Sequence, residues 1–137
     1  MRHAHAEWPG YSGEDFDRPL TPRGLADAAS AARAMRAAGH IPDLLLASPA
    51  RRTRQTAEVV VATMELPSSV LRFVDSLYNA TASTLARELQ RASSTGLVLL
   101  VAHNPGISEL AKKLAEDPAC PPLLPAGWGC FSAPASP

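Results

Sequence analysis

The stretch GLVLLVA at residues 96–102 constrains the fold of this chain most strongly. Six consecutive apolar residues, from Leu97 to Ala102, show no alternation with polar ones. A strand with one face in water alternates apolar and polar side chains, whereas a strand inside a parallel sheet is covered on both faces. The run therefore predicts a buried central strand in a parallel sheet with helices packed on both sides.

Helical patterns alternate with other short apolar runs along the chain. In the helix expected at 21–38, Thr21 is the cap, Pro22 is the first residue and Gly39 follows the end. The other expected elements are a strand at 44–48, a helix at 51–64, a strand at 70–74, a helix at 81–93, a helix capped by Asn104 with Pro105 as its first residue, and a short strand at 128–131. Residues 5–20, with a turn at Pro9-Gly10, read as a loop. The pattern predicts one α/β domain over 1–137 with a mostly parallel sheet and a loose tail at 132–137.

Composition excludes several classes of partner and leaves the oligomeric state open. Thirteen Lys and Arg residues balance thirteen Asp and Glu residues, so no long-range field favours nucleic acid or an anionic membrane. No apolar run approaches the ~18 residues that a membrane span needs. The two cysteines, Cys120 and Cys130, are too few for a disulfide framework, which favours a reducing, cytoplasmic location.

Arginine and histidine side chains fall where the predicted strands end. His103 follows the central strand directly, Arg51, Arg52 and Arg54 lie in the first turn after strand 44–48, and Arg2-His3 precede the first loop. In open parallel sheets, ligands bind outside the carboxyl ends of the strands. Guanidinium and imidazole groups gathered there, beside helix N-termini, suit a phosphoryl group. A neutral imidazole can also act as the covalent nucleophile, and no metal or other cofactor is required.

Two further hypotheses stay open at this stage. The chain could be a non-catalytic module that binds phosphate without turning it over. Alternatively, His3, His5 and His103 could ligate zinc, although no carboxylate-rich motif accompanies them.

Four segments in the same order resemble the histidine phosphatase superfamily, which also holds the phosphoglycerate mutases. They are RHA at 2–4, DRPLTPRG at 17–24, SPARRTRQTAE at 48–58 and AHNPGISELA at 102–111. The short length and LYNA at 77–80 resemble the SixA-type phosphohistidine phosphatases, and the similarity spans residues 2–131. The resemblance implies a three-layer, phosphoglycerate mutase-like sandwich. It also implies a phosphorylated small molecule or a phosphohistidine protein as substrate.

The resemblance also implies roles for individual residues. His3 matches the nucleophile that becomes phosphohistidine, and Arg2 matches the arginine beside it. Arg52, three residues before the Gln-Thr pair, matches the second arginine of the phosphate pocket. His103 matches the second pocket histidine, and Asn104 follows it as a further phosphate-binding residue. Asp75 is the nearest counterpart of the carboxylate that protonates the leaving group in larger members.

The beginning of the sequence departs from the family pattern. The family places a full strand before the Arg-His pair, and here only Met1 precedes Arg2, so we expect the usual first strand to be truncated. We expect that the true start of the protein lies upstream of Met1. The alternative is that the chain is a degenerate copy of a family member, with His3 on a mobile terminus. An α-amino group two residues from His3 would also disfavour a charged imidazole.

Overall fold

The structure is a computed structural model, which describes residues 1–8 and 13–132. The helices are α1 (Pro22–Ala37), α2 (Arg51–Met64), α3 (Ala82–Arg91) and α4 (Gly106–Ala115), and the strands are β1 (Leu44–Ala47), β2 (Leu71–Phe73) and β3 (Val98–Val101). Short 3-10 helices span Asp15–Asp17, Ser68–Val70, Asp75–Leu77 and Ser93–Thr95. The turn expected at Pro9-Gly10 and most of the expected tail lie outside the described residues.

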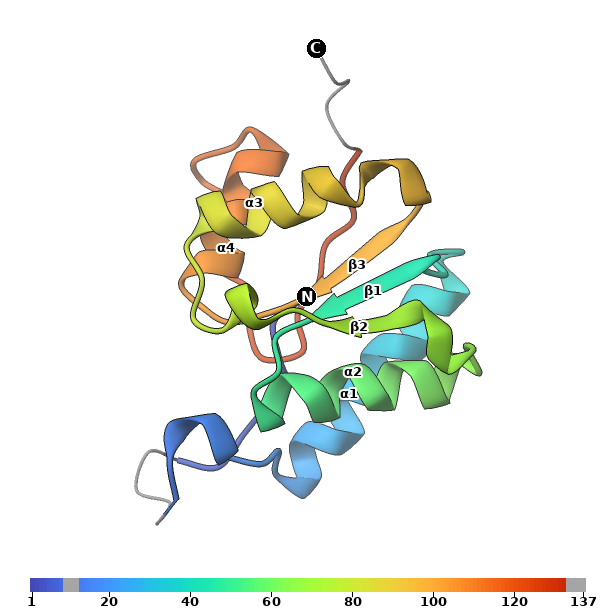
Figure 1. Cartoon of the computed structure of the whole chain (residues 1–137), viewed down its shortest axis with the longest axis vertical. Helices are drawn as coiled ribbons and strands as arrows, with labels where there is room; N and C mark the ends of the chain where they lie inside the picture. Colours follow the sequence, from blue (N-terminus) through green and yellow to red (C-terminus); the bar gives the residue numbers. More distant parts are fainter. Residues whose placement is uncertain (9–12, 133–137) are drawn as a thin grey trace.

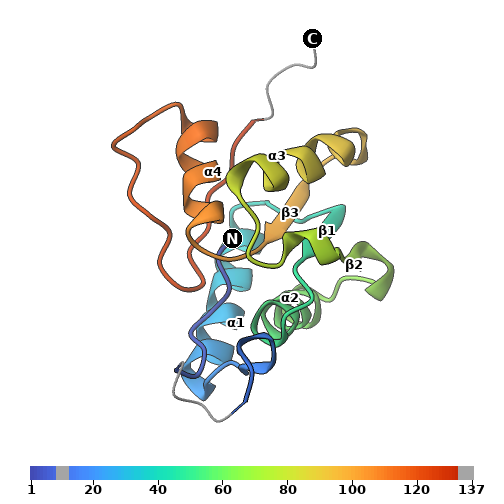
Figure 2. The same cartoon turned by 60° about the vertical axis from the view of Figure 1, so that its left-hand side comes forward.

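Within the described residues, the strands form one parallel sheet in the order β2-β1-β3. The middle strand is the fully buried β1, so the prediction that the 97–102 run is the central strand is wrong: the first half of β3 is only half-buried. Helices α1 and α2 cover one face, and α3 and α4 cover the other (Figures 1 and 2). Side chains alternate between two cores: Leu45, Ala47 and Val101 join the α1–α2 side, whereas Leu44, Leu46 and Leu100 join the α3–α4 side. The three-layer α/β sandwich predicted from the sequence is thereby confirmed.

Local sequence signals fix the starts of α1 and α3, where Thr21 and Thr81 are the caps, but the prediction for α4 contains an error. Thr21 caps α1 by accepting a hydrogen bond from the Gly24 N–H, and Pro22 is the first helical residue. The predicted cap at Asn104 is wrong, because α4 begins at Gly106 and its N-cap is Pro105. The Asn104 side chain instead bonds the Leu123 carbonyl and the Ser108 hydroxyl, which fastens the C-terminal segment to α4.

At the ends of the chain, one expectation is wrong and one of the alternatives is contradicted. Residues 128–131 form no strand. His3 does not lie on a loose terminus, because its N–H donates to the Ala102 carbonyl at 3.1 Å and the Ala102 N–H donates to the Met1 carbonyl at 3.1 Å. Residues 1–3 thus lie parallel to the end of β3, and Met1 is buried. An apolar groove of about 460 Å³ lies between α1, α3 and α4, and Met1 and residues of β3 line it.

The Met1 amino group does not act on His3 as a nearby cation. It donates to the Leu100 carbonyl at 2.7 Å. Burial lowers the pKa of this group from 8.0 to about 5, so it is mostly neutral at pH 7.

No helix in the described part of the chain has the length and apolar character needed to span a bilayer.

The segment that carries His5 runs directly against the first turn of α1. Gly24 is buried there, and a Cβ at this position would overlap the His5 carbonyl oxygen. We predict that Gly24→Ala lowers the free energy of unfolding by about 2 kcal/mol, because the overlap outweighs the ~1 kcal/mol by which alanine favours a helix. Urea denaturation checks this, with Ala26→Gly at an exposed position of α1 as the control. Greater stability in Gly24→Ala would contradict the close approach.

Candidate active site

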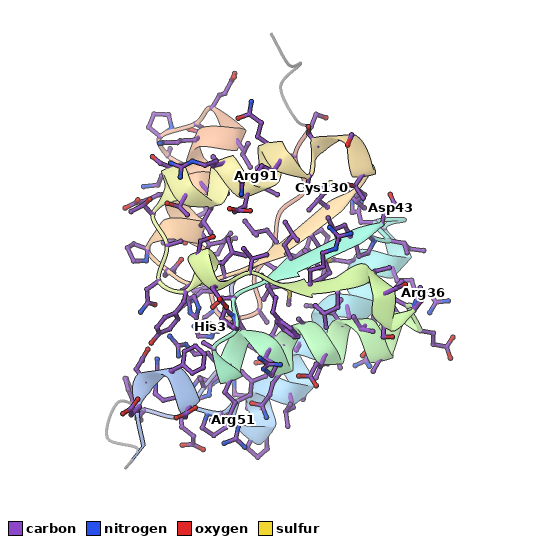
Figure 3. All side chains as sticks on the ribbon, in the orientation of Figure 1. His3, Arg36, Asp43, Arg51, Arg91 and Cys130 are labelled. Carbon is purple, nitrogen blue, oxygen red and sulfur yellow. The ribbon has the colours of Figure 1, made fainter. Side chains whose placement is uncertain are left out.

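The carboxyl end of the sheet gathers side chains from three segments far apart in the sequence. His3 follows the N-terminal residues paired with β3, Arg52 lies in the first turn of α2 and His103 lies two residues beyond the end of β3. The imidazole centroids of His3 and His103 are 5.4 Å apart, and all three side chains are buried. Figure 3 shows His3 at this edge of the sheet, near the start of α2. The predicted convergence of the two histidines is therefore present.

The His3 ring is held as a neutral imidazole with one free nitrogen. Its Nδ1 lies 2.7 Å from the Ala4 carbonyl oxygen, which can only accept a hydrogen bond, so Nδ1 carries the proton. Burial lowers the pKa of His3 to about 4, with further lowering by the positive charges of Arg52 and Arg2. At neutral pH, Nε2 therefore keeps an unprotonated lone pair, and within the described residues it forms no hydrogen bond.

The His103 ring is anchored by Ser48, a buried residue that follows β1. Its Nε2 lies 2.7 Å from the Ser48 hydroxyl oxygen, and that oxygen also accepts the Ala50 N–H at 3.4 Å. We assign the Ser48 hydroxyl as the donor to Nε2, which places the ring proton on Nδ1. Burial lowers the pKa of His103 to about 3, and Arg52 and His3 contribute in the same direction. His103 is then a neutral donor through Nδ1.

Three buried polar atoms of the described residues have no hydrogen-bond partner: two belong to this cluster, and the third belongs to Arg2, whose positive charge also acts on His3. They are Arg2 Nε, Arg52 Nε and His103 Nδ1. Buried polar groups are nearly always paired, so orphaned donors at one place indicate a ligand that accepts hydrogen bonds. Two guanidiniums and an imidazole N–H suit a tetrahedral oxyanion. The cluster therefore has the unpaired donors and the free imidazole nitrogen that an anion pocket with a nucleophile would need.

Several residues that the sequence reasoning missed complete the surroundings of this pocket. Asp15 pairs with Arg52, and its carboxylate also accepts hydrogen bonds from Tyr78 and Arg18. Arg52 and Tyr78 lie far from Asp15 in the sequence, whereas Arg18 is three residues away. Arg18 belongs to the quoted motif that contains DRPL at 17–20, and Tyr78 belongs to LYNA. Ser48 opens the motif SPARRTRQTAE, so its place directly after a strand was the available signal.

Other candidate residues lie outside the pocket or act differently. Asp75 is exposed, and its side chain forms no hydrogen bond or ion pair with the described residues. Arg51 and Arg54 are exposed, and the Arg54 guanidinium lies over the Phe73 ring, 4.2 Å from its centroid. His5 contacts the Thr21 hydroxyl at 2.8 Å. Among residues 1–8 and 13–132, no group of three His, Cys, Asp or Glu side chains could hold a metal ion.

Ser48 should matter to catalysis through His103. We predict that Ser48→Ala lowers kcat about tenfold with KM changed less than twofold, because the His103 ring loses the hydrogen bond that fixes its tautomer. Steady-state kinetics on an aryl phosphate checks this, with the exposed Ser83→Ala as the control. An unchanged kcat in a folded Ser48→Ala protein would remove Ser48 from the account.

Comparison with known proteins places the chain in a family. The model of the histidine phosphatase superfamily (branch 1) matches residues 1–73. An uncharacterised chloroplastic protein of Arabidopsis thaliana, At3g52155, is 33% identical over 124 residues, covering 84% of this chain and 57% of that protein. The uncharacterised protein Rv1276c of Mycobacterium tuberculosis is 37% identical over 117 residues, covering 85% of this chain and 70% of the relative. The chain belongs to the histidine phosphatase superfamily.

Solved structures show which branch of that superfamily the chain resembles. A structure described as phosphohistidine phosphatase SixA from Agrobacterium tumefaciens has a TM-score of 0.76 and 31% identity, covering 83% of this chain and 73% of that one. A protein histidine phosphatase SixA bound to tungstate has a TM-score of 0.75 and 27% identity, covering 91% of this chain and 79% of that one. The fold and the sequence together are of the SixA type.

Proposed function

We propose that this protein is a metal-independent phosphatase that works through a phosphohistidine intermediate on His3. The observation that carries the proposal is the neutral, buried His3 ring, whose Nε2 is free beside the Arg52 and His103 side chains. An uncharged imidazole nitrogen is a competent nucleophile toward phosphorus. The surrounding guanidiniums supply the charge that phosphoryl transfer requires.

The reaction runs in two displacements. In the first, His3 Nε2 attacks phosphorus, the bond from phosphorus to the leaving group breaks, and the leaving group departs with that electron pair. In the second, a water molecule attacks the phosphorus of phospho-His3, releasing inorganic phosphate and returning neutral His3, while the water proton passes to solvent. Arg2, Arg52 and the His103 Nδ1–H stabilise the equatorial oxygens in both transition states.

The proposed substrates are phosphohistidine in a protein or a small phosphomonoester. The SixA likeness supports phosphohistidine, whose imidazole leaving group needs less protonation than an alkoxide. Asp75 as a proton donor and Asn104 as a phosphate contact stay predictions: Asp75 is exposed, and both ends of the Asn104 amide are bonded within the protein. The two thiols, both free, support a reducing compartment such as the cytoplasm.

Release of phosphate from a phosphohistidine peptide and from an aryl phosphate, with and without EDTA, tests this function. We expect turnover that EDTA leaves unchanged and that vanadate inhibits. Binding of vanadate without turnover of either substrate would instead identify a non-catalytic phosphate-binding module. Turnover abolished by EDTA would contradict the metal-independent mechanism.

A further inference from the structure

The carboxylate of Asp15 lies against the guanidinium that we assign to phosphoryl binding. Arg52 donates through Nη1 to the Asp15 backbone carbonyl at 2.7 Å and through Nη2 to Asp15 Oδ2 at 3.1 Å. Arg52 is almost fully buried, with 3% of its side chain exposed, whereas half of the Asp15 side chain is exposed. The contact therefore joins a half-exposed side chain at the edge of the site to a buried side chain inside it.

These two bonds occupy one end of the Arg52 fork and leave another edge free. A guanidinium carries five N–H donors in a fixed plane, so hydrogen bonds donated by Nη1 and Nη2 to one residue set the plane and rotation of the whole group. Arg52 Nε is buried and has no partner among the described residues. The edge formed by Nε and the adjacent Nη2 hydrogen therefore has an unpaired donor, and its geometry matches two oxygens of an oxyanion.

Asp15 is itself held by two donors besides Arg52. Tyr78 donates its hydroxyl hydrogen to Asp15 Oδ2 at 2.6 Å, and Arg18 Nε donates to Asp15 Oδ1 at 3.0 Å. The Tyr78 hydrogen bond is the largest cause that lowers the pKa of Asp15, followed by the positive charges of Arg52 and Arg18. The Tyr78 ring also packs edge-on against His103, with 5.6 Å between ring centroids. The carboxylate is thus charged and fixed from both sides of the site.

We propose that Asp15 is a positioning residue that turns the Nε edge of Arg52 toward the bound phosphoryl group. In the alternative role, the Asp15 carboxylate is a competitor that occupies the position of the phosphoryl group on Arg52. The two roles differ in a measurable way. If Asp15 positions Arg52, an acceptor atom in the residue 15 side chain strengthens oxyanion binding. If Asp15 competes with the oxyanion, removal of the Asp15 carboxylate strengthens oxyanion binding. The inference rests on the proposed function only in treating Arg52 as a phosphoryl contact.

A pair of variants with equal charge separates positioning from electrostatic repulsion. Asp15→Asn and Asp15→Ala both remove the negative charge, but only asparagine keeps a side-chain oxygen that can accept from Arg52. We expect tungstate, measured by titration calorimetry, to bind Asp15→Ala about tenfold more weakly than Asp15→Asn, the size expected for one hydrogen bond to a charged group. Equal affinities, or tighter binding by Asp15→Ala, would overturn the proposal.

Two more variants control for local damage and for the second partner. Asp17→Ala removes an exposed carboxylate from the same 3-10 helix, with no side-chain hydrogen bond among the described residues, and should leave tungstate affinity within twofold of the parent. Tyr78→Phe removes one donor to Asp15 and should weaken binding two- to fivefold, while unchanged affinity would remove Tyr78 from the proposal. Because tungstate binding needs no turnover, the result is independent of whether the proposed catalytic cycle is correct.

Discussion

Replacing His3 by alanine should reduce phosphatase turnover by at least ~10³-fold, because the nitrogen that we propose as the nucleophile is lost while the arginines proposed to bind the phosphoryl group remain. The structure shows why another group would not take over. His103 Nε2 is engaged with Ser48, and its Nδ1 is assigned the ring proton, so the second imidazole lacks a free lone pair. Residual activity should therefore reflect only charge stabilisation and binding.

The matched control is His5→Ala, two residues along the same segment. His5 is exposed, and its ring contacts the Thr21 hydroxyl rather than the pocket. Its replacement should leave kcat within about twofold, in line with the small effects of surface substitutions. The comparison is made by steady-state kinetics on both substrate classes, with melting curves to confirm folding. Equal losses in the two variants would point to damage of the N-terminal segment instead of a chemical role.

Lowering the pH from 8 to 4 should destabilise the fold strongly. In a protein that begins at Met1, the Met1 amino group and the His3 and His103 rings all have folded-state pKa values below their ordinary ones, at about 5, 4 and 3 against 8.0, 6.5 and 6.5. In this range the unfolded chain binds more protons than the folded one, so stability rises with pH. The stability that these groups contribute is fully present above pH 8, and it is lost as the pH falls toward their folded-state pKa values. Each pKa unit corresponds to about 1.4 kcal/mol, so we expect a loss of at least about 3 kcal/mol.

Urea denaturation at pH 8, 6.5, 5 and 4 measures this dependence. The loss between pH 8 and 6.5 reports mainly the Met1 amino group, and the loss below 6.5 reports the histidines. His103→Gln should flatten the dependence below pH 6.5 and leave the upper part unchanged. Stability that is flat or increasing as the pH falls from 8 to 5 would show that these groups are not desolvated in the folded protein.

Sequence patterns predicted the scaffold well because helix and strand signals here are local. The GLVLLVA run places β3 in the sheet, and Thr21 and Pro22 define the start of α1 by their own chemistry. The convergence of His3 and His103 also followed from topology, since the carboxyl ends of parallel strands share one edge. The position of the pocket was therefore predictable without knowledge of any long-range contact.

The contacts that tune the pocket could not be predicted in the same way. Asp15 reaches Arg52 and Tyr78 across 37 and 63 residues of sequence, and Ser48 reaches His103 across 55. No local pattern encodes such pairings. Asn104 was misassigned as a helix cap because its residue type fits that role, although the C-terminal segment passes close enough to bond its amide. Both cases show tertiary contacts deciding between roles that a polar side chain could fill.

The most direct test of the account is capture of the phosphoryl group on the enzyme. The protein is mixed with a ³²P-labelled phosphohistidine peptide, quenched within milliseconds in alkali and digested for mass spectrometry. We predict an alkali-stable, acid-labile phosphoryl group on the peptide that contains His3, absent from His3→Ala and present in His5→Ala. Turnover in the parent protein with label on any other residue, or with label retained in His3→Ala, would contradict His3 as the nucleophile.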